Sequence, residues 1–168
     1  DWHALLFPEG YTMFNPVVGG QLRGDAPMQV ISGRLDKPVV HFEAPNREEL
    51  DDELSVFTQW FNDSRVDNTL DPLLRAAITH LWFVTLHPLD DGNGRITRLL
   101  TDLALAQAEH QSVRFYAMSV AILANRKSYY DILEQTQKGG MDITVWLKWF
   151  FETLNQTFDA ALQEIDKT

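Results

Sequence analysis

The 168-residue chain contains no cysteine. A disulfide framework is therefore excluded, and cysteine usage gives no information on the redox compartment. Positive charge is also scarce, because 14 lysine and arginine residues face 24 aspartate and glutamate residues, for a net charge of −10. Such a surface repels phosphate groups, so we expect neither a nucleic acid nor an anionic membrane as a partner. Wherever the protein binds an anion, positive charge has to be placed locally.

Long hydrophobic runs are absent as well. No apolar stretch reaches the roughly 18 residues of a membrane span, and the start lacks the basic-then-apolar order of a signal peptide. These absences predict a cytoplasmic protein with no membrane partner. The chain has no internal repeat, and its length and 45% hydrophobic residues predict one domain with a substantial core. Because it opens at Asp1 rather than Met, we expect a fragment or a processed product.

The pattern along the chain predicts an all-α fold, a helical bundle with one small β-hairpin. Glycine and proline are frequent near the start, so residues 1–22 are expected to be an irregular segment that packs on a single domain over residues 23–168. Short apolar runs around a turn predict a hairpin over Met28–Phe42. Apolar spacing and capping signals at Asn46 and Asp71 predict helices over about residues 46–61, 71–85, 95–110, 119–137 and 143–165.

One segment, from His87 to Arg98, carries most of the chemical information: His-Pro-Leu-Asp-Asp-Gly-Asn-Gly-Arg-Ile-Thr-Arg. Its two glycines let backbone N–H groups approach a ligand closely, and the helix that follows presents its positive end. Arg95 lies three positions before Arg98, so both guanidinium groups can meet a polyphosphate tail from one helical face. The segment therefore predicts an anion site.

Two further residues of this segment suggest what the anion site is for. Asp91 would be repelled by a bound phosphate unless a Mg²⁺ ion lay between them, and Mg²⁺ commonly uses one or two carboxylates plus substrate phosphates. His87 has a side chain that titrates near neutrality and can accept a proton from an attacking hydroxyl. Together these residues predict a bound nucleotide, a bound metal ion and a general base. The segment matches neither the phosphate-loop pattern nor the dinucleotide fingerprint.

The segment resembles the signature of the Fic family, which reads His-Pro-Phe, any residue, Asp or Glu, Gly-Asn-Gly-Arg, two free positions and Arg. Eight positions agree: His87, Pro88, Asp91, Gly92, Asn93, Gly94, Arg95 and Arg98. Leu89 replaces the usual Phe, and since leucine also buries well, we expect slight repacking and no loss of activity. The resemblance extends from about Arg23 to Phe151 and implies a Fic-type bundle whose hairpin is the flap of that family.

For function, the resemblance implies a protein adenylyltransferase, which moves AMP from ATP onto a Ser, Thr or Tyr hydroxyl of a target protein with release of pyrophosphate. His87 would be the general base and Asp91 the residue that holds Mg²⁺. The nucleotide would be bound by the remaining motif positions, namely Gly92, Asn93, Gly94, Arg95 and Arg98. Gly94 favours AMP transfer, because the phosphorylating branch of the family has a bulkier Lys there.

Outside the motif, the resemblance places Tyr129 and Tyr130 against the adenine and ribose, although one buried and one exposed helix tyrosine fits the sequence equally well. Gln137 stands where relatives often have an Asn that contacts the base. The resemblance also implies that the flap pairs with the target by strand addition along an edge formed by Val30, Ile31, Ser32 and Gly33. A purely structural hairpin is equally compatible with its sequence.

Three functions remain open at this point: an AMP transferase, a Fic transferase with another donor such as a different nucleoside triphosphate or a choline-bearing nucleotide, and a regulatory module that only binds nucleotide. His80 is expected to be a core or surface residue and not a ligand. Many Fic proteins are inhibited by a helix reading Ser or Thr, three free residues, Glu, then Gly or Asn, whose glutamate pairs with the second motif arginine, here Arg98. No glutamate of this chain fits that pattern. We expect the inhibitory helix on an upstream segment or a separate antitoxin-like chain, while self-association into a homo-oligomer stays open.

Overall fold

A computed structural model describes residues 2–8, 17–34, 37–109 and 118–166. It is mainly helical with one small antiparallel sheet, which confirms the predicted fold class. The elements are, in order, α1 (Trp2–Leu6), β1 (Gln29–Arg34), β2 (Lys37–Glu43), α2 (Arg47–Asp63), the 3₁₀ turn η1 (Ser64–Val66), α3 (Pro72–Leu86), α4 (Asn93–Glu109), α5 (Met118–Ala124), α6 (Arg126–Gln137) and α7 (Thr144–Asp166). None of the described helices is long and apolar enough to cross a membrane.

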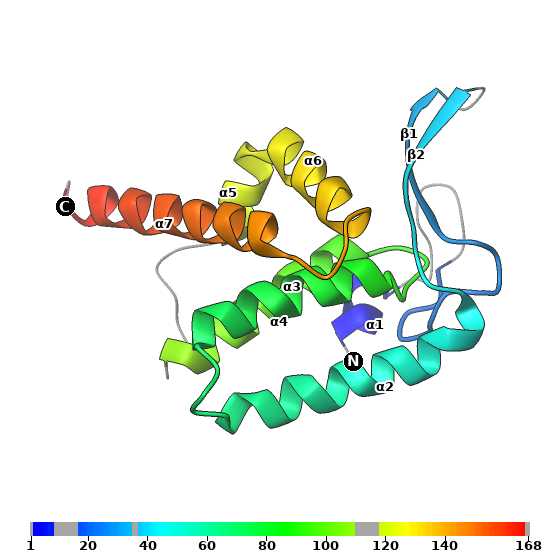
Figure 1. Cartoon of the computed structure of the whole chain (residues 1–168), viewed down its shortest axis with the longest axis horizontal. Coiled ribbons are helices and arrows are strands. Elements are labelled where there is room, and N and C mark those ends of the chain that lie inside the picture. Colours follow the sequence, from blue (N-terminus) through cyan, green and yellow to red (C-terminus); the bar gives the residue numbers. More distant parts are fainter. Residues whose placement is uncertain (1, 9–16, 35–36, 110–117, 167–168) are drawn as a thin grey trace.

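Helix α3 lies at the centre of the bundle. It packs along α4, with α2 on one side and α5, α6 and α7 on the other (Figure 1). Residues on nearly every side of α3 are buried, including the small Ala76 and Ala77, as expected of a helix enclosed by others. Trp146 of α7 is fully buried and donates its indole N–H to the carbonyl oxygen of Ala77 at 2.9 Å. This contact fixes α7 against the middle of α3.

The hairpin stands at one end of the bundle, beside the C-terminal end of α6 (Figure 1). Its strands pair in a regular antiparallel register except at one point, because Val30 faces Phe42 while Ile31 faces Val40. His41 is therefore the extra residue of a β-bulge, a feature that bends a strand and re-aims a side chain.

Local signals account for most helix boundaries. Asp71 caps α3 as predicted, since its carboxylate accepts from the backbone N–H groups of Leu73 and Leu74. Asn46 occupies the N-cap position of α2, but its side chain makes no capping hydrogen bond there. Helix α2 begins after Asn46, close to where it was predicted, although the predicted side-chain cap is missing.

Two secondary-structure predictions were wrong in part. Residues 2–6 form the short helix α1 within a segment predicted to be irregular, and the contacts of this helix with the motif loop explain its order. The single helix predicted over residues 119–137 is two helices separated at Asn125. The backbone leaves helical geometry at Asn125, with φ −104° and ψ 29°, so α5 ends before this residue and α6 begins after it.

Candidate active site

The motif forms the loop between α3 and α4 together with the first turns of α4, and His87 is the C-cap residue of α3. His87 adopts a left-handed conformation (φ 47°, ψ 53°), and it is the one non-glycine residue with positive φ in the part of the chain that the structure describes. Left-handed backbone is costly for a residue with a side chain and often marks a functional position. Gly92, with φ 86°, makes the second left-handed turn of the loop, just before α4.

The hydrogen bonds of His87 determine which ring nitrogen carries the proton. Nδ1 lies 3.1 Å from the carbonyl oxygen of Val84, an acceptor, so Nδ1 carries the hydrogen and donates it. Nε2 is then left with a lone pair. Burial lowers the pKa of His87 below its ordinary value, the bond to Val84 opposes this shift, and the positive charge of Arg23 adds to it. At neutral pH the imidazole is therefore uncharged and can accept a proton.

The internal shape of the loop depends on Asn93, the first residue of α4. Its side-chain oxygen accepts from the backbone N–H of Leu89 at 2.9 Å, and its side-chain nitrogen donates to the carbonyl oxygen of the same residue at 2.7 Å. Asn93 is buried, and so is Leu89, which packs into the core as predicted for this replacement of the family's Phe. The oxygen and the nitrogen of the Asn93 side-chain amide thus both hold the loop in shape. The predicted contact of Asn93 with a phosphate stays a prediction.

Asp91 and Arg95 lie on the exposed side of the loop. One Asp91 oxygen accepts from the backbone N–H of Gly92 at 2.5 Å, and the other lies 3.5 Å from the Arg95 guanidinium. The carboxylate is about half exposed, so it can bind a cation without prior rearrangement of the core. No group of three or more His, Cys, Asp or Glu side chains gathers as a metal site among residues 2–8, 17–34, 37–109 and 118–166. A metal here would take one carboxylate from the protein.

Arg98 lies one turn further along α4 and faces the same cavity as His87. A methyl group added at Gly94 would lie 3.3 Å from its guanidinium nitrogen, so the absence of a side chain at Gly94 leaves room for Arg98. Within the described ranges Arg98 forms no ion pair. Its charge is therefore available to an anion.

A cavity of about 600 Å³ opens above this loop, a volume that suits a nucleotide-sized ligand. Its wall combines residues of the motif with residues of the hairpin and α6. Of the residues predicted from the sequence, it includes Val30, Ile31, His87, Gly94, Arg98, Tyr129, Tyr130 and Gln137. Asp91 and Gly92 on the loop, and Asn93 and Arg95 at the start of α4, lie beyond this wall. Ser32 and Gly33 belong to β1 by their backbone pairing with Val39 and Pro38.

The two tyrosines of α6 differ in exposure, because Tyr129 is 5% exposed and Tyr130 is 48% exposed. The Tyr129 hydroxyl bonds to Nε2 of His80 at 2.9 Å. His80 is fully buried, as the prediction of a core residue allowed, and its Nδ1 lies 2.9 Å from the hydroxyl of Thr101. Tyr129 can therefore present only its ring to the cavity, whereas Tyr130 retains a free approach. Gln137 donates to the hydroxyl of Thr85 at 3.1 Å.

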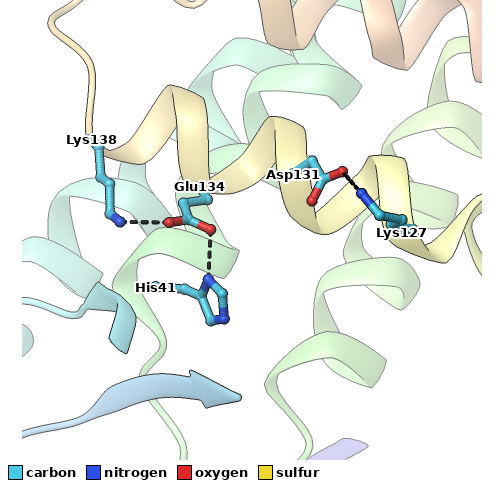
Figure 2. Close-up of polar contacts among 5 residues, drawn as sticks. All are labelled: His41, Lys127, Asp131, Glu134 and Lys138. Carbon is cyan, nitrogen blue, oxygen red and sulfur yellow. Dashed lines mark hydrogen bonds and ion pairs between the residues drawn. The ribbon is translucent and has the colours of Figure 1, made fainter. Parts of the chain in front are cut away.

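The hairpin is tied to α6 by a contact that the sequence did not predict. Figure 2 shows Nδ1 of His41 pointing at Glu134, whose second oxygen points at Lys138. The distances are 2.6 Å to His41 and 2.5 Å to Lys138. The hydrogen bonds from Lys138 and His41 lower the pKa of Glu134. The contact between His41 and Glu134, called the clasp below, fixes the hairpin over the cavity, because the β-bulge turns the His41 side chain toward α6. Only the three-dimensional structure could show this contact.

Residues near the N-terminus also support the loop, and sequence reasoning missed them. His3 accepts from the backbone N–H of Gly20 through Nδ1 and donates through Nε2 to the carbonyl oxygen of Asp91 at 3.0 Å. The Phe7 ring lies under the Arg95 guanidinium, 4.7 Å from it. Arg23, 2% exposed, contacts the backbone of His87. Arg23 stands between Leu22 and Gly24, outside any motif, so its role was not apparent from sequence spacing.

Comparisons with known proteins identify the family of this chain. The model of the Fic/DOC family matches residues 1–105. A protein of Nematostella vectensis named protein adenylyltransferase Fic is 31% identical over 118 residues, which cover 70% of this chain and 26% of that relative. The protein of the same name from Drosophila melanogaster is 32% identical over 106 residues, or 63% of this chain and 20% of that relative. The chain thus spans about a fifth to a quarter of the length of these curated relatives.

Solved structures show the same fold. The crystal structure of a Fic family protein from Desulfovibrio desulfuricans G20 has a TM-score of 0.74 at 22% identity and covers 96% of this chain and 45% of that one. A Fic domain containing signaling protein from Bacteroides thetaiotaomicron VPI-5482 has a TM-score of 0.65 at 21% identity, with 88% and 57% covered. With the motif loop, the bundle and a family match over most of its length, this chain belongs to the Fic/DOC family.

Proposed function

We propose that this protein is an adenylyltransferase that moves AMP from ATP onto a Ser, Thr or Tyr hydroxyl of a target protein. The observation that carries the proposal is the state of His87. Its Nδ1–H is bound to Val84, its pKa is lowered by burial, and it lines a nucleotide-sized cavity together with Arg98. A neutral imidazole at such a place is suited to accept a proton. The names of the curated relatives support the same reaction.

The chemical step follows from this geometry. The target hydroxyl oxygen attacks the α-phosphorus of ATP, and Nε2 of His87 takes up the hydroxyl proton. The new bond between oxygen and the α-phosphorus forms as the bond to the β-phosphate oxygen breaks, and pyrophosphate leaves. Arg95 and Arg98 hold the departing phosphates, so the protein contributes position and charge neutralisation.

The residues present also fit a magnesium ion. The Asp91 carboxylate is about half exposed and bound only loosely to Arg95, at 3.5 Å. One carboxylate from the protein is a common share for Mg²⁺, which takes its other ligands from phosphates and water. When bound, the ion would neutralise charge on the triphosphate. Asp91 is held in place for that task through its own backbone, because His3 binds its carbonyl oxygen.

The hairpin is proposed as the docking site for the target segment. The sheet has two strands, so β1 has one edge that pairs with no other described strand. Ile31 on this strand is 53% exposed. An extended target segment can add to such an edge through main-chain hydrogen bonds and carry its hydroxyl toward His87. We also propose that Arg98, when ATP is absent, accepts an inhibitory glutamate from another segment or partner chain.

Labelling with radioactive ATP tests the reaction. The protein is incubated with Mg²⁺, a mixture of candidate protein targets and ATP labelled at either the α- or the γ-phosphate. Transfer of AMP labels protein from the α-position alone. His87→Ala should abolish this labelling while the dissociation constant for ATP, measured by calorimetry, stays within about threefold, because the loop and arginines hold the phosphates. Label arriving from the γ-position, or native labelling by the variant, would refute the proposal.

Calorimetry also distinguishes between the possible nucleotide donors. Calorimetric titration with ATP, GTP, UTP and CTP measures which base the cavity prefers. The wall offers the ring of Tyr129, the exposed Tyr130 and the amide of Gln137 to the base. We expect ATP to bind most tightly. A stronger response to another nucleotide would keep Fic chemistry and change the donor.

A further inference from the structure

Arg23 joins three parts of the site, although no motif contains it. Its Nε donates to the carbonyl oxygen of His87 at 3.0 Å, and its backbone N–H donates to the carbonyl oxygen of Pro88 at 2.9 Å. Another guanidinium nitrogen donates to the carbonyl oxygen of Pro45, which lies two residues after the end of β2. We propose that Arg23 is a positioning residue for AMP transfer, which holds the backbone of His87 in its left-handed conformation and fixes the base of the hairpin relative to it. This inference rests on the function proposed above.

The end of α3 explains why His87 needs such support. The last carbonyl groups of a helix have no partner within the helix, so their orientation depends on groups outside it. Here two successive carbonyl groups, those of His87 and Pro88, are bound by one residue. Because the orientation of both peptide planes is then set, His87 keeps its unusual φ and ψ, and its ring keeps the bond from Nδ1 to Val84.

The contact of Arg23 with Pro45 also fixes the position of the hairpin. The backbone N–H of Ala44 bonds to the carbonyl oxygen of Met28 at 2.9 Å, which closes the hairpin at its base. Arg23 binds the next residue along the chain, Pro45, so one rigid guanidinium joins the flap to the catalytic histidine. A target strand docked on β1 would therefore be placed at a defined distance from Nε2 of His87.

Arg23 also acts on His87 through its charge. Burial is the main cause of the lowered pKa of His87, and the nearby positive charge of Arg23 lowers it further. Other charged or titratable groups that share the cavity with His87 come from the hairpin, α4 and α6, and they are His41, Arg98, Arg126, Lys127, Tyr129, Tyr130, Asp131 and Glu134. None of these groups is itself altered when Arg23 is replaced, and Arg23→Lys keeps the positive charge that Arg23→Met removes. Comparing these two variants therefore measures the effect of the charge.

Arg75 provides a matched control, because it is the same residue type in a comparable setting away from the site. It is 4% exposed and donates to the carbonyl oxygen of Phe61, the hydroxyl of Ser64 and the side-chain oxygen of Gln107. None of these partners belongs to the motif loop or the hairpin. A loss that follows only from removing a buried arginine should therefore be equal in Arg23→Met and Arg75→Met.

The first measurement is steady-state AMP transfer by wild type, Arg23→Met, Arg23→Lys and Arg75→Met. We expect kcat of Arg23→Met to fall about 100-fold, the size of loss that a misplaced catalytic group causes, while the dissociation constant for ATP changes little. Arg23→Lys keeps the charge and one donor, so its loss should be smaller. Arg75→Met should keep its kcat. Equal losses of kcat at both arginines, with both variants folded, would overturn the proposal.

The second measurement needs no activity. Titration of the His87 ring followed by NMR should show a higher pKa in Arg23→Met than in wild type, because a positive charge is removed. Arg23→Lys should keep the wild-type value, and so should Arg75→Met. An unchanged titration in Arg23→Met would refute the role of the charge. If wild type transfers no AMP, the proposed function fails, and this titration still decides whether Arg23 controls His87. If Arg23→Met does not fold, Arg23→Lys carries the test through its kcat.

Discussion

Acidification should destabilise this protein through His80, a residue remote from the surface. His80 is 0% exposed, and burial, followed by the positive charge of Arg98, lowers its pKa to about 3. The Thr101 hydroxyl donates to the carbonyl oxygen of Thr97 at 2.8 Å, so it accepts the hydrogen of His80 Nδ1. Nε2 then accepts from the Tyr129 hydroxyl. The neutral ring is thus satisfied on both sides, and a second ring proton would find an acceptor only if the Tyr129 hydroxyl turned its own hydrogen away from His80.

The sign and size of the effect follow from proton linkage. A histidine in the unfolded chain has a pKa of about 6.5, so below this pH the unfolded state binds a proton that the native state refuses until about pH 3. The contribution of His80 to the free energy of unfolding is therefore fully present above pH 6.5, and it falls by about 1.4 kcal/mol per pH unit below that pH. Between pH 7.5 and pH 5.0 the free energy of unfolding should decrease by about 2 kcal/mol from this group alone.

Urea unfolding followed by tryptophan fluorescence measures this, since the chain has five tryptophans. Other groups titrate over the same range, and His87 contributes with the same sign because its pKa is also lowered. The comparison is therefore between wild type and His80→Gln, a neutral side chain with one donor and one acceptor end. The variant should start less stable, but it should lose about 2 kcal/mol less than wild type between pH 7.5 and 5.0. Parallel pH profiles for the two proteins would refute the reasoning.

Further predictions concern the loop and the hairpin. Asp91→Ala should weaken ATP binding and make it insensitive to EDTA in calorimetry, whereas equal affinity of wild type with and without EDTA would remove the metal from this residue. Gly92→Ala should destabilise the fold by about 1–3 kcal/mol, because φ is 86° and the new methyl would lie 3.1 Å from the Phe7 ring. Gly24→Ala is its control, since no atom lies within 4 Å of the added methyl. Glu134→Gln should loosen the hairpin and speed its cleavage in limited proteolysis, while Asp51→Asn, which breaks an exposed ion pair with Arg47, should leave cleavage unchanged.

The sequence by itself determined the class of the fold and the place of the chemistry. Helical spacing is a local property, so most helices lie where the pattern predicted them, and Asp71 caps α3 as its position indicated. The motif from His87 to Arg98 is contiguous, so its loop could be recognised without any long-range information. Where the backbone departs from helical geometry inside one apolar pattern, as at Asn125, spacing alone predicted a single helix in place of two.

The tertiary structure decided how the site is held together. The bond between Arg23 and His87 joins residues 64 positions apart, and the clasp between His41 and Glu134 joins residues 93 apart. Such contacts depend on how whole elements pack, and no spacing rule reaches that far. The same holds for His80 on α3, whose hydrogen bond with the Tyr129 hydroxyl on α6 keeps that hydroxyl from the cavity. Residue types therefore indicated the reaction, while packing decided which residues support the left-handed backbone of His87 and hold the hairpin over the cavity.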